Sequence, residues 1–432
     1  MAGTFNPDFH HTTKVNASSG APLKPTNSPQ LRYAFFRTIE SAGNDWEVVA
    51  NRSGDVFLQR PYLHALEMAP PHEIRFGYLV FYVDNSPAGI AVCQTKRFSA
   101  AESITDLNNT PERDPCFYNG VANWLKRRIA GWVDAEILVC GNLMVTGKHG
   151  FWFDPALIAL EETPTLLLNG LQGCIPQFDR NSSKIAMILI KDVTPEEQPV
   201  LGKYFTQKQF SEFDIQPNMV LHLDDYADFD SYLGAMTTKY RTRAKRAFKK
   251  GEALERRELS KNEIMEAAPE MFALYKSVAK SAGFNVVDLN ENYMPVLFKS
   301  LEGDFRVFGY YLEGKMVAYC TTLKNNEELE AHFLGYDKAL NHDYQLYLNM
   351  LYDMIRVAFS SGCSRVIFAR TALEIKSSAG AVPEHLYCYL KHQNPLINNF
   401  TSNILEYLTP VEEWQQRHPF KHLQPEHGEE TD

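Results

Sequence analysis

The stretch DDYADFDSYLGAMTTKYRTRAKRAFKKG (Asp224–Gly251) sets an acidic beginning against a basic end on one predicted helix. Asp228 can cap the start of this helix, and apolar residues follow it at steps of three or four. These apolar residues are Phe229, Leu233, Met236, Tyr240, Ala244 and Ala247. The order of charges matches the helix dipole, which favours anions in the first turn and cations in the last. The pattern predicts a helix that packs on a sheet through one face and presents cations on the others.

The basic end of this stretch contrasts with the rest of the chain. Between Lys239 and Lys250, seven of twelve residues are Lys or Arg, whereas the whole chain carries 43 Lys and Arg against 53 Asp and Glu, a net charge of −10. Because the cluster is a local feature of an acidic chain, we predict that it binds an anionic ligand through Arg241, Arg243 and Lys245. A solvated helix face is the alternative interpretation.

Length and composition indicate a globular protein of two or more domains, with 432 residues and 44% hydrophobic content. The apolar runs are far shorter than the roughly 20 residues that cross a bilayer, and the N-terminus has no apolar signal core. The seven cysteines form no CxxC pair, which favours reduced, packed thiols over a zinc site or a disulfide framework. We therefore expect a cytoplasmic protein with no membrane span, no DNA partner and no tightly bound cofactor.

Two similar α/β units are predicted, at residues 31–215 and 216–415, between a disordered tail at 1–30 and a flexible acidic tail at 416–432. The second unit runs from a short strand through two helices into a meander of three strands over residues 305–337, with Glu313-Gly314 and Asn325-Asn326 as turns. A helix over about 343–361 and a buried strand over 365–369 follow. The first unit also runs hairpin, strand, helix, strand. The predicted fold class is α/β (α+β), with a mostly antiparallel sheet flanked by helices in each unit.

This order of elements resembles that of the GNAT acyltransferases. The segments YLGAMTTKYRTRAKRAFKKG (232–251) and ALEIKSSAGAVPEHLYCYLKH (372–392) resemble two regions of FemAB-like proteins, and the tandem arrangement resembles the same group over about residues 40–400. The resemblance implies tandem GNAT-like domains that transfer an acyl group to the amine of a small-molecule acceptor. Acyl-CoA and aminoacyl-tRNA are the candidate donors, so tRNA is a candidate partner.

One segment departs from the pattern of the GNAT enzymes. These enzymes hold the pyrophosphate of acyl-CoA on a glycine-containing turn at a helix N-terminus, and the corresponding KALNHDYQLY (338–347) has no glycine. The departure favours a Fem-type ligase that takes aminoacyl-tRNA and acts on cell-wall or lipid precursors, or a binding protein without catalysis. In the first unit, CGNLMVTGKHGFWFD (140–154) holds Gly141, Gly147 and Gly150 around Lys148, as an anion-binding loop or as turns.

Catalytic candidates lie on the strand ELEAHFLGYD (328–337), whose alternation predicts that Glu328, Glu330, His332 and Leu334 share one face. The resemblance places this strand along the acyl channel. There Glu330 or His332 would accept the proton of the attacking amine, and Tyr336 would protonate the leaving group. Leu334 and Gly335 are expected to contact the donor.

Further candidates follow the strand 365–369 at its carboxyl end, where α/β sheets commonly build binding sites. Lys376 in EIKSSAGA matches the lysine of FemAB-like proteins in this region, and the resemblance implies that it stabilises a developing oxyanion or a phosphate. Arg370 is expected to contact the donor. A surface ion pair between Glu374 and the nearby cations is the alternative.

Overall fold

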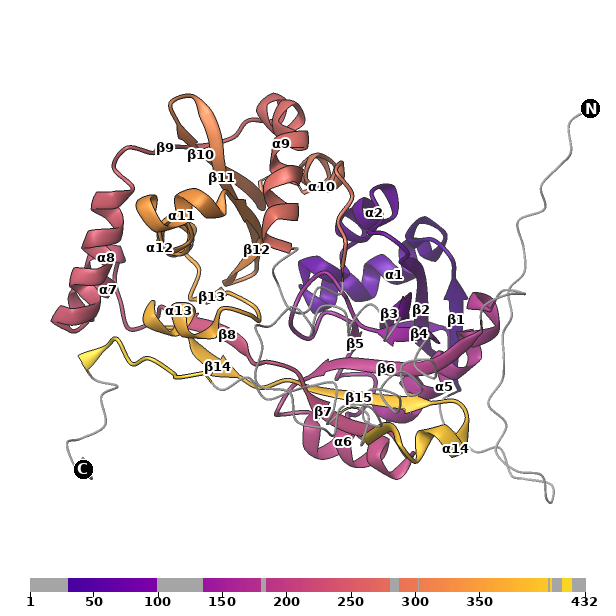
Figure 1. Cartoon of the computed structure of the whole chain (residues 1–432). Coiled ribbons are helices and arrows are strands. Elements are labelled where there is room, and N and C mark those ends of the chain that lie inside the picture. Colours follow the sequence, from indigo (N-terminus) through magenta and orange to yellow (C-terminus); the bar gives the residue numbers. More distant parts are fainter. Residues whose placement is uncertain are drawn as a thin grey trace, which may run out of the picture.

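The computed structural model describes residues 30–98, 135–179, 184–279, 287–301, 303–402, 405 and 414–421. The chain folds into two α/β units that lie side by side (Figure 1). The first contains β1 (Leu31–Phe36), α1 (Ile39–Ser53), the 3-10 helix η1 (Val56–Leu58), α2 (Arg60–Met68), β2 (Arg75–Val83), β3 (Ser86–Phe98), β4 (Ala135–Cys140), β5 (Phe151–Phe153), α5 (Thr163–Phe178), β6 (Ile185–Val193), α6 (Gln198–Gln207) and β7 (Ser211–Asp214).

The second unit begins with β8 (Asn218–His222), α7 (Phe229–Ala235), α8 (Thr238–Lys250), β9 (Glu255–Glu258), α9 (Lys261–Ala279) and α10 (Tyr293–Ser300). It continues with β10 (Phe305–Leu312), β11 (Lys315–Asn325), β12 (Glu328–Tyr336), α11 (Lys338–Tyr344), α12 (Leu346–Ser360), β13 (Arg365–Ile367), α13 (Leu373–Ser378) and β14 (Val382–Glu384). The last elements are β15 (Tyr387–His392) and α14 (Pro395–Asn398).

Both sheets are mostly antiparallel, which confirms the predicted fold class. The first has the order β1-β2-β3-β4-β6-β15-β7, with β5 on β3, and the second has the order β14-β8-β13-β12-β11-β10-β9. Each sheet contains one parallel pair, β4 with β6 and β12 with β13, where a helix connects the partners. The predicted turn at Glu313-Gly314 joins β10 to β11, and both residues have positive φ, as a tight hairpin turn requires.

After the second unit the chain returns to the first sheet. β15 lies between β6 and β7 of the first sheet and pairs antiparallel with both, although it follows the second unit in the chain (Figure 1). The predicted division at 215/216 therefore differs from the structure, because residues 387–392 complete the first sheet. β6 pairs with β4 on one side and with β15 on the other, so β6 is not left as an unpaired edge of the sheet.

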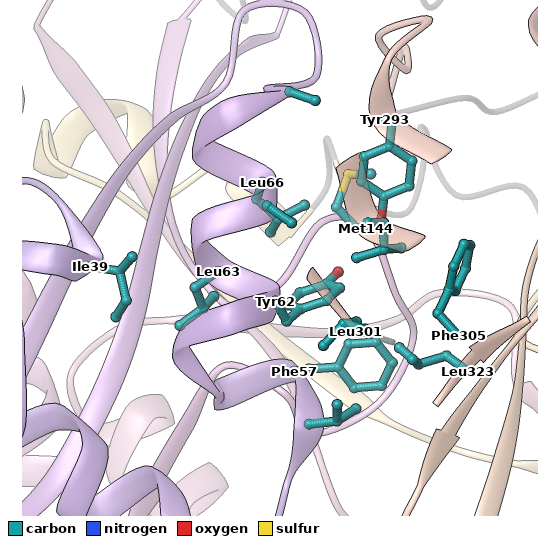
Figure 2. Close-up of a cluster of buried hydrophobic side chains, with 14 of the residues drawn as sticks. Ile39, Phe57, Tyr62, Leu63, Leu66, Met144, Tyr293, Leu301, Phe305 and Leu323 are labelled. Carbon is teal, nitrogen blue, oxygen red and sulfur yellow. The ribbon is translucent and has the colours of Figure 1, made fainter. Parts of the chain in front are cut away.

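One of the hydrophobic core clusters contains side chains of both units. Phe57 of η1 and Tyr62 of α2 lie in one cluster of buried side chains with Tyr293, Leu301 and Phe305 of the second unit (Figure 2). Each fully buried aromatic or aliphatic side chain of this kind contributes about 1.5–3 kcal/mol. This contact determines how the first unit faces the strand β12.

The basic helix is broken into two helices, contrary to the prediction of one. Asp228 caps α7 as predicted and accepts a hydrogen bond from the Ser231 amide over 2.7 Å. Met236 and Thr237 then adopt extended backbone, because Met236 forms a β-bridge with Phe420 and the Thr237 amide donates to the Pro419 carbonyl over 2.8 Å.

Part of the predicted flexible tail at 416–432 is thus attached to the second unit. The Arg417 amide donates to Ser377 Oγ over 3.1 Å, which holds the same segment against α13. The predicted tail residues 1–29 and 422–432 lie outside the described residues. None of the helices in the described ranges combines the length and the apolar character needed to cross a membrane.

Candidate active site

Glu330 is a buried carboxylate in the middle of the second sheet. Its residue is 4% exposed, and it forms the last pair of the short parallel ladder between β12 and β13, opposite Ile367. Beyond this pair β12 continues to Tyr336 without β13 at its side, so the sheet opens next to Glu330. Burial raises the pKa of Glu330 to about 8. Its Oε1 atom has no hydrogen-bond partner among the described residues.

The first unit supplies the charged neighbours of this carboxylate. His149 Nε2 lies 3.8 Å from Glu330 Oε1, and His149 Nδ1 lies 2.8 Å from Asp55 Oδ2. Burial opposes the charge on His149, but the Asp55 and Glu330 carboxylates outweigh it and raise the pKa of the imidazole. Asp55 is fixed in turn by the Phe57 amide at 3.0 Å and by Asn325 Nδ2 of the second unit at 3.2 Å. Asp55, His149 and Glu330 therefore form one row across the contact between the units, with the imidazole between the two carboxylates.

The glycine-rich loop 141–150 carries His149 into this row. A Cβ on Gly147 would lie 2.5 Å from His149 Nε2, and a Cβ on Gly150 would lie 2.5 Å from the Cα of Gly141. These glycines allow the loop to fold tightly under the imidazole, which is the turn interpretation of the sequence. Lys148 forms an ion pair with Glu197.

A β-bulge places His332 and Phe333 on the same face of β12. Thr322 pairs with Ala331 and Cys320 with Leu334, so the single residue Thr321 faces two residues of β12. The Thr321 hydroxyl fills the interruption, donating to the Phe333 carbonyl and accepting from the Phe333 amide, both over 2.9 Å. The predicted face is therefore correct as far as His332 and wrong at Leu334, which packs in the core cluster on the opposite side of the sheet.

His332 ends a line of buried polar groups. Its Nε2 lies 2.7 Å from the Tyr293 hydroxyl, and Asn142 Nδ2 donates to the Tyr62 hydroxyl over 3.2 Å. Burial lowers the pKa of His332 to about 3, so its imidazole is neutral. Figure 2 shows the hydroxyl groups of Tyr62 and Tyr293 turned toward one another.

The proton on the neutral imidazole of His332 can take either ring nitrogen. When the Tyr293 hydroxyl donates to Nε2, the N–H of the imidazole is on Nδ1, and when Nε2 donates to that hydroxyl, Nδ1 is an acceptor. In both tautomers Nδ1 is a buried atom with no hydrogen-bond partner within the described ranges. Glu330 Oε1 and His332 Nδ1 are thus two buried polar atoms on one face of β12 that make no hydrogen bond within the described residues. The ring of Phe57 contacts His149 at 4.5 Å and His332 at 6.4 Å, measured between ring centroids.

The other candidates on β12 lie away from this pair. Tyr336 faces the opposite core cluster, and its ring centroid lies 5.9 Å from that of Tyr347. Gly335 is buried where α9 crosses the strand, since a Cβ there would lie 2.5 Å from the Tyr275 amide nitrogen. The contacts of Gly335 in the structure are therefore packing contacts.

Arg370 joins the two units behind His149. Its guanidinium lies 2.7 Å from Asp192 Oδ1, and its Nε donates to the Gln216 carbonyl over 2.7 Å. Asp192 also accepts from the Gly147 amide over 3.0 Å and pairs with Lys191. Although burial opposes the charge, Lys191 and Arg370 hold the pKa of Asp192 down at about 2. This network supports the loop that carries His149.

Lys376 is buried and turned toward its own loop. Its ammonium donates to the carbonyls of Ala369 and Arg370 over 3.1 and 2.6 Å, and burial lowers its pKa to about 7. Ala369 and two later residues of this loop, Thr371 and Ala372, have positive φ without being glycine, so the lysine holds a strained segment in place.

The residues of the basic helix separate into different environments. Arg241 donates to the Gly234 carbonyl over 3.2 Å, whereas Lys245 is exposed. Arg243 lines an open pocket of about 450 Å³ with Lys239, Tyr240, Glu374, Ile375 and Arg417. The predicted ion-pair alternative at Glu374 is present, since its carboxylate lies 3.1 Å from Arg417.

The segment without glycine caps the helix that follows it. Residues 338–344 form the short helix α11, and Asn341 Oδ1 accepts a hydrogen bond from the Tyr347 amide in the first turn of α12 over 3.0 Å. A side chain of the protein thus occupies a helix-terminal amide of the kind that binds pyrophosphate in the GNAT pattern.

Sequence reasoning found the strand with Glu330 and His332 but missed Asp55, His149, Tyr62 and Tyr293. The interval GKHG offered a weak signal, a histidine between two glycines. Asp55, Tyr62 and Tyr293 carry no local signal, because they reach the site only through the contact between the units.

Comparisons with known proteins agree with this architecture. Residues 238–377 match the model of the acetyltransferase (GNAT) domain family. Among solved structures, FemX is similar with a TM-score of 0.50 and 12% identity, over 82% of this chain and 98% of that chain. A tandem GNAT protein from the clavulanic acid biosynthesis pathway has a TM-score of 0.48 and 10% identity, over 85% of this chain and 99% of that one.

A third similar structure, L-PGS from Bacillus licheniformis, has a TM-score of 0.42 and 10% identity, over 80% of this chain and 95% of that chain. A comparison with curated proteins finds no match. The matched domain contains α8, the meander strands β10 to β12, α12 and most of α13, and therefore both Glu330 and His332. Residues 238–377 thus match an acetyltransferase (GNAT) domain, within a chain that has the fold of FemX over most of its length.

Proposed function

We propose that this protein transfers an acyl group from an activated donor, an acyl-CoA or an aminoacyl-tRNA, to the amine of a small acceptor at Glu330 and His332. The observation that carries the proposal is the pair of buried, unpartnered polar atoms on one face of β12, Glu330 Oε1 and His332 Nδ1. Acyl transfer to an amine needs a proton acceptor for the nucleophile and a hydrogen-bond donor for the carbonyl oxygen, and this pair offers both.

In the proposed reaction the amine attacks the acyl carbon, and Glu330 accepts the proton that the nitrogen loses. The new C–N bond replaces the C–S bond of a thioester or the C–O bond of an aminoacyl ester, and the released thiolate or alkoxide takes up the proton that Glu330 accepted. A carboxylate with a pKa of about 8 is a much stronger base than an ordinary one, so proton transfer from an ammonium is less unfavourable.

The Nδ1–H group of His332 would donate to the carbonyl oxygen as negative charge develops there. In this reaction the Tyr293 hydroxyl, 2.7 Å from Nε2, would donate to Nε2 and keep the imidazole in the tautomer that has this donor. His149, held by Asp55, would stabilise Glu330 when it is ionised.

The test presents acetyl-CoA, longer acyl-CoAs and charged tRNA separately, each with a panel of primary amines, and detects acylated amine by mass spectrometry. With the productive donor, Glu330→Gln should lower the transfer rate at least about a hundredfold. Glu327→Gln removes a carboxylate from an exposed residue in the turn that precedes β12 and should keep the wild-type rate. A wild-type rate in Glu330→Gln would remove Glu330 from the reaction.

Tyr293→Phe tests the second half of the site. The substitution removes the hydroxyl that orients His332 and keeps the ring in the core, so it should lower the rate about tenfold to a hundredfold with little change in substrate affinity. An unchanged rate in this variant would contradict the role of His332 as an oriented donor.

A further inference from the structure

The pocket at the start of α8 collects positive charge on an acidic chain. Its lining contains Lys239 and Arg243 of α8, Arg417 of the segment 414–421, and a single carboxylate, Glu374 of α13. Glu374 and Arg417 are paired at 3.1 Å, so the charges of Lys239 and Arg243 are left uncompensated by the other lining residues. The whole chain has a net charge of −10, so this concentration of cations is local.

The lining of the pocket suits an anion that carries an organic group. Tyr240 and Ile375 add an aromatic and an aliphatic side chain to the cationic lining. The Lys239 ammonium lies 5.6 Å from the centre of the Tyr240 ring, which limits the directions the lysine takes. The pocket also adjoins the first turn of α8, where the Thr237 side chain makes no capping hydrogen bond. Guanidinium and ammonium donors from α8 and from the segment 414–421 therefore converge on one space of about 450 Å³.

We propose that this pocket binds a phosphate group of the acyl donor, an inference that rests on the proposed function for the identity of the ligand. Two guanidinium groups and an ammonium match the oxygens of a phosphate, and the apolar lining accommodates the nucleoside attached to it. Both candidate donors carry such a group, as the phosphates of coenzyme A or the phosphodiesters at the 3′ end of tRNA.

The position of the pocket is consistent with a donor whose carrier and acyl group lie apart. Glu374 and Ile375 belong to α13, which follows β13 through the loop that Lys376 holds, and β13 is the strand that separates from β12 next to Glu330. α13 thus connects the pocket, on the side of α8, to the strand that pairs with Glu330, whose carboxylate lies on the side of the first unit.

The experiment measures binding by titration calorimetry with three probes: adenosine 3′,5′-bisphosphate, coenzyme A and a single-stranded RNA oligonucleotide. The double variant Lys239→Gln with Arg243→Gln should weaken binding of the best probe at least tenfold. The matched control, Arg246→Gln with Lys249→Gln, removes the same charge from exposed positions of the same helix outside the pocket and should stay within threefold of wild type. Melting temperatures of both variants verify that they are folded.

A variant that is expected to bind the probe more tightly strengthens the test. Glu374→Gln removes the carboxylate from the pocket and releases Arg417 from its ion pair, so it should tighten binding severalfold. Three results would each overturn the proposal. They are an equal loss of affinity in the two double variants, no loss of affinity in either, and no binding of any probe at millimolar concentration.

The arms of the experiment also identify the source of the phosphate. Binding of the small probes with a weak dependence on salt supports coenzyme A, whereas binding of the RNA with affinity that falls steeply with salt supports tRNA. Because these measurements need no turnover, they separate the two proposals. Loss of transfer in Glu330→Gln with unchanged affinity in the pocket variants would sustain the proposed function and reject the pocket.

Discussion

His149 Nε2 lies 3.8 Å from Glu330 Oε1, across the contact between the first and the second unit. The two side chains come from different sheets, one on a glycine-rich loop and one on the strand β12 of the GNAT domain. Asp55 holds the other side of the imidazole at 2.8 Å. The charge of Glu330 in the second unit therefore depends on the first unit.

The buried carboxylate makes folding stability depend on pH. The pKa of Glu330 in the folded state, about 8, exceeds its ordinary value of 4.5, so the folded state binds the proton more tightly. The contribution of this group to the free energy of unfolding is fully present below about pH 4.5 and is lost as the pH rises to 8. Wild-type protein should thus lose stability between pH 5 and 9 by a few kcal/mol more than Glu330→Gln, as measured by urea unfolding. Parallel pH profiles for the two proteins would show that Glu330 is ionised without cost in the folded state.

Removing the imidazole should move the titration of Glu330. A protonated His149 favours the ionised carboxylate, so His149→Gln should raise the apparent pKa of the rate and shift its pH profile to higher pH. The substitution keeps a polar side chain in the row. His342→Gln changes an exposed histidine on α11 and should leave the profile in place. A profile that does not move in His149→Gln would separate the histidine from the base.

Breaking the ion pair behind His149 should weaken the junction of the units. Arg370→Gln leaves Asp192 buried with Lys191 as its remaining cation, and the loss of one partner from a buried pair costs about 3–5 kcal/mol. Arg306→Gln is the matched control, because Arg306 pairs with Glu258 at the surface, where such pairs contribute about 0–1 kcal/mol. Thermal unfolding of both variants measures the difference, and equal effects would mean that the pair with Asp192 does not join the units.

Lys376 should give the opposite dependence of stability on pH. Its pKa in the folded state, about 7, lies below its ordinary value of 10.5, so the unfolded state binds the proton more tightly between these values. Stability from this group should therefore rise as the pH increases from 7 to 10.5. Lys376→Met keeps the length, removes the charge and should lack this rise when melting temperatures are compared across that range. A rise of equal size in the variant would assign the dependence to other groups.

A methyl group at Gly335 should separate α9 from β12. The new Cβ would lie 2.5 Å from the Tyr275 amide nitrogen, an atom of a packed helix that cannot rotate away, so Gly335→Ala should cost about 1–3 kcal/mol. Gly234→Ala provides the control, because a Cβ there meets nothing within 4 Å and should leave stability unchanged or raise it slightly. Equal stability of the two variants in chemical unfolding would show that α9 adjusts without loss.

The sequence by itself determined the local elements and the strand that carries the catalytic candidates. The period of two in residues 328–332 predicted that Glu330 and His332 share a face, and Asp228 was correctly predicted to cap the helix α7. Turn residues at Glu313-Gly314 fixed the meander. These features depend on neighbours within a few positions, and a linear pattern records such neighbours directly.

Only the tertiary structure decided what surrounds Glu330 and which strands complete each sheet. Asp55 and His149 are 94 residues apart and meet through the packing of two units, so no local spacing records their contact. The bulge at Thr321 moved Leu334 to the other face, and β15 crossed to the first sheet. Long-range packing controls burial, and burial shifts the pKa of Glu330, which explains why the candidates were readable from the sequence and their chemical state was not.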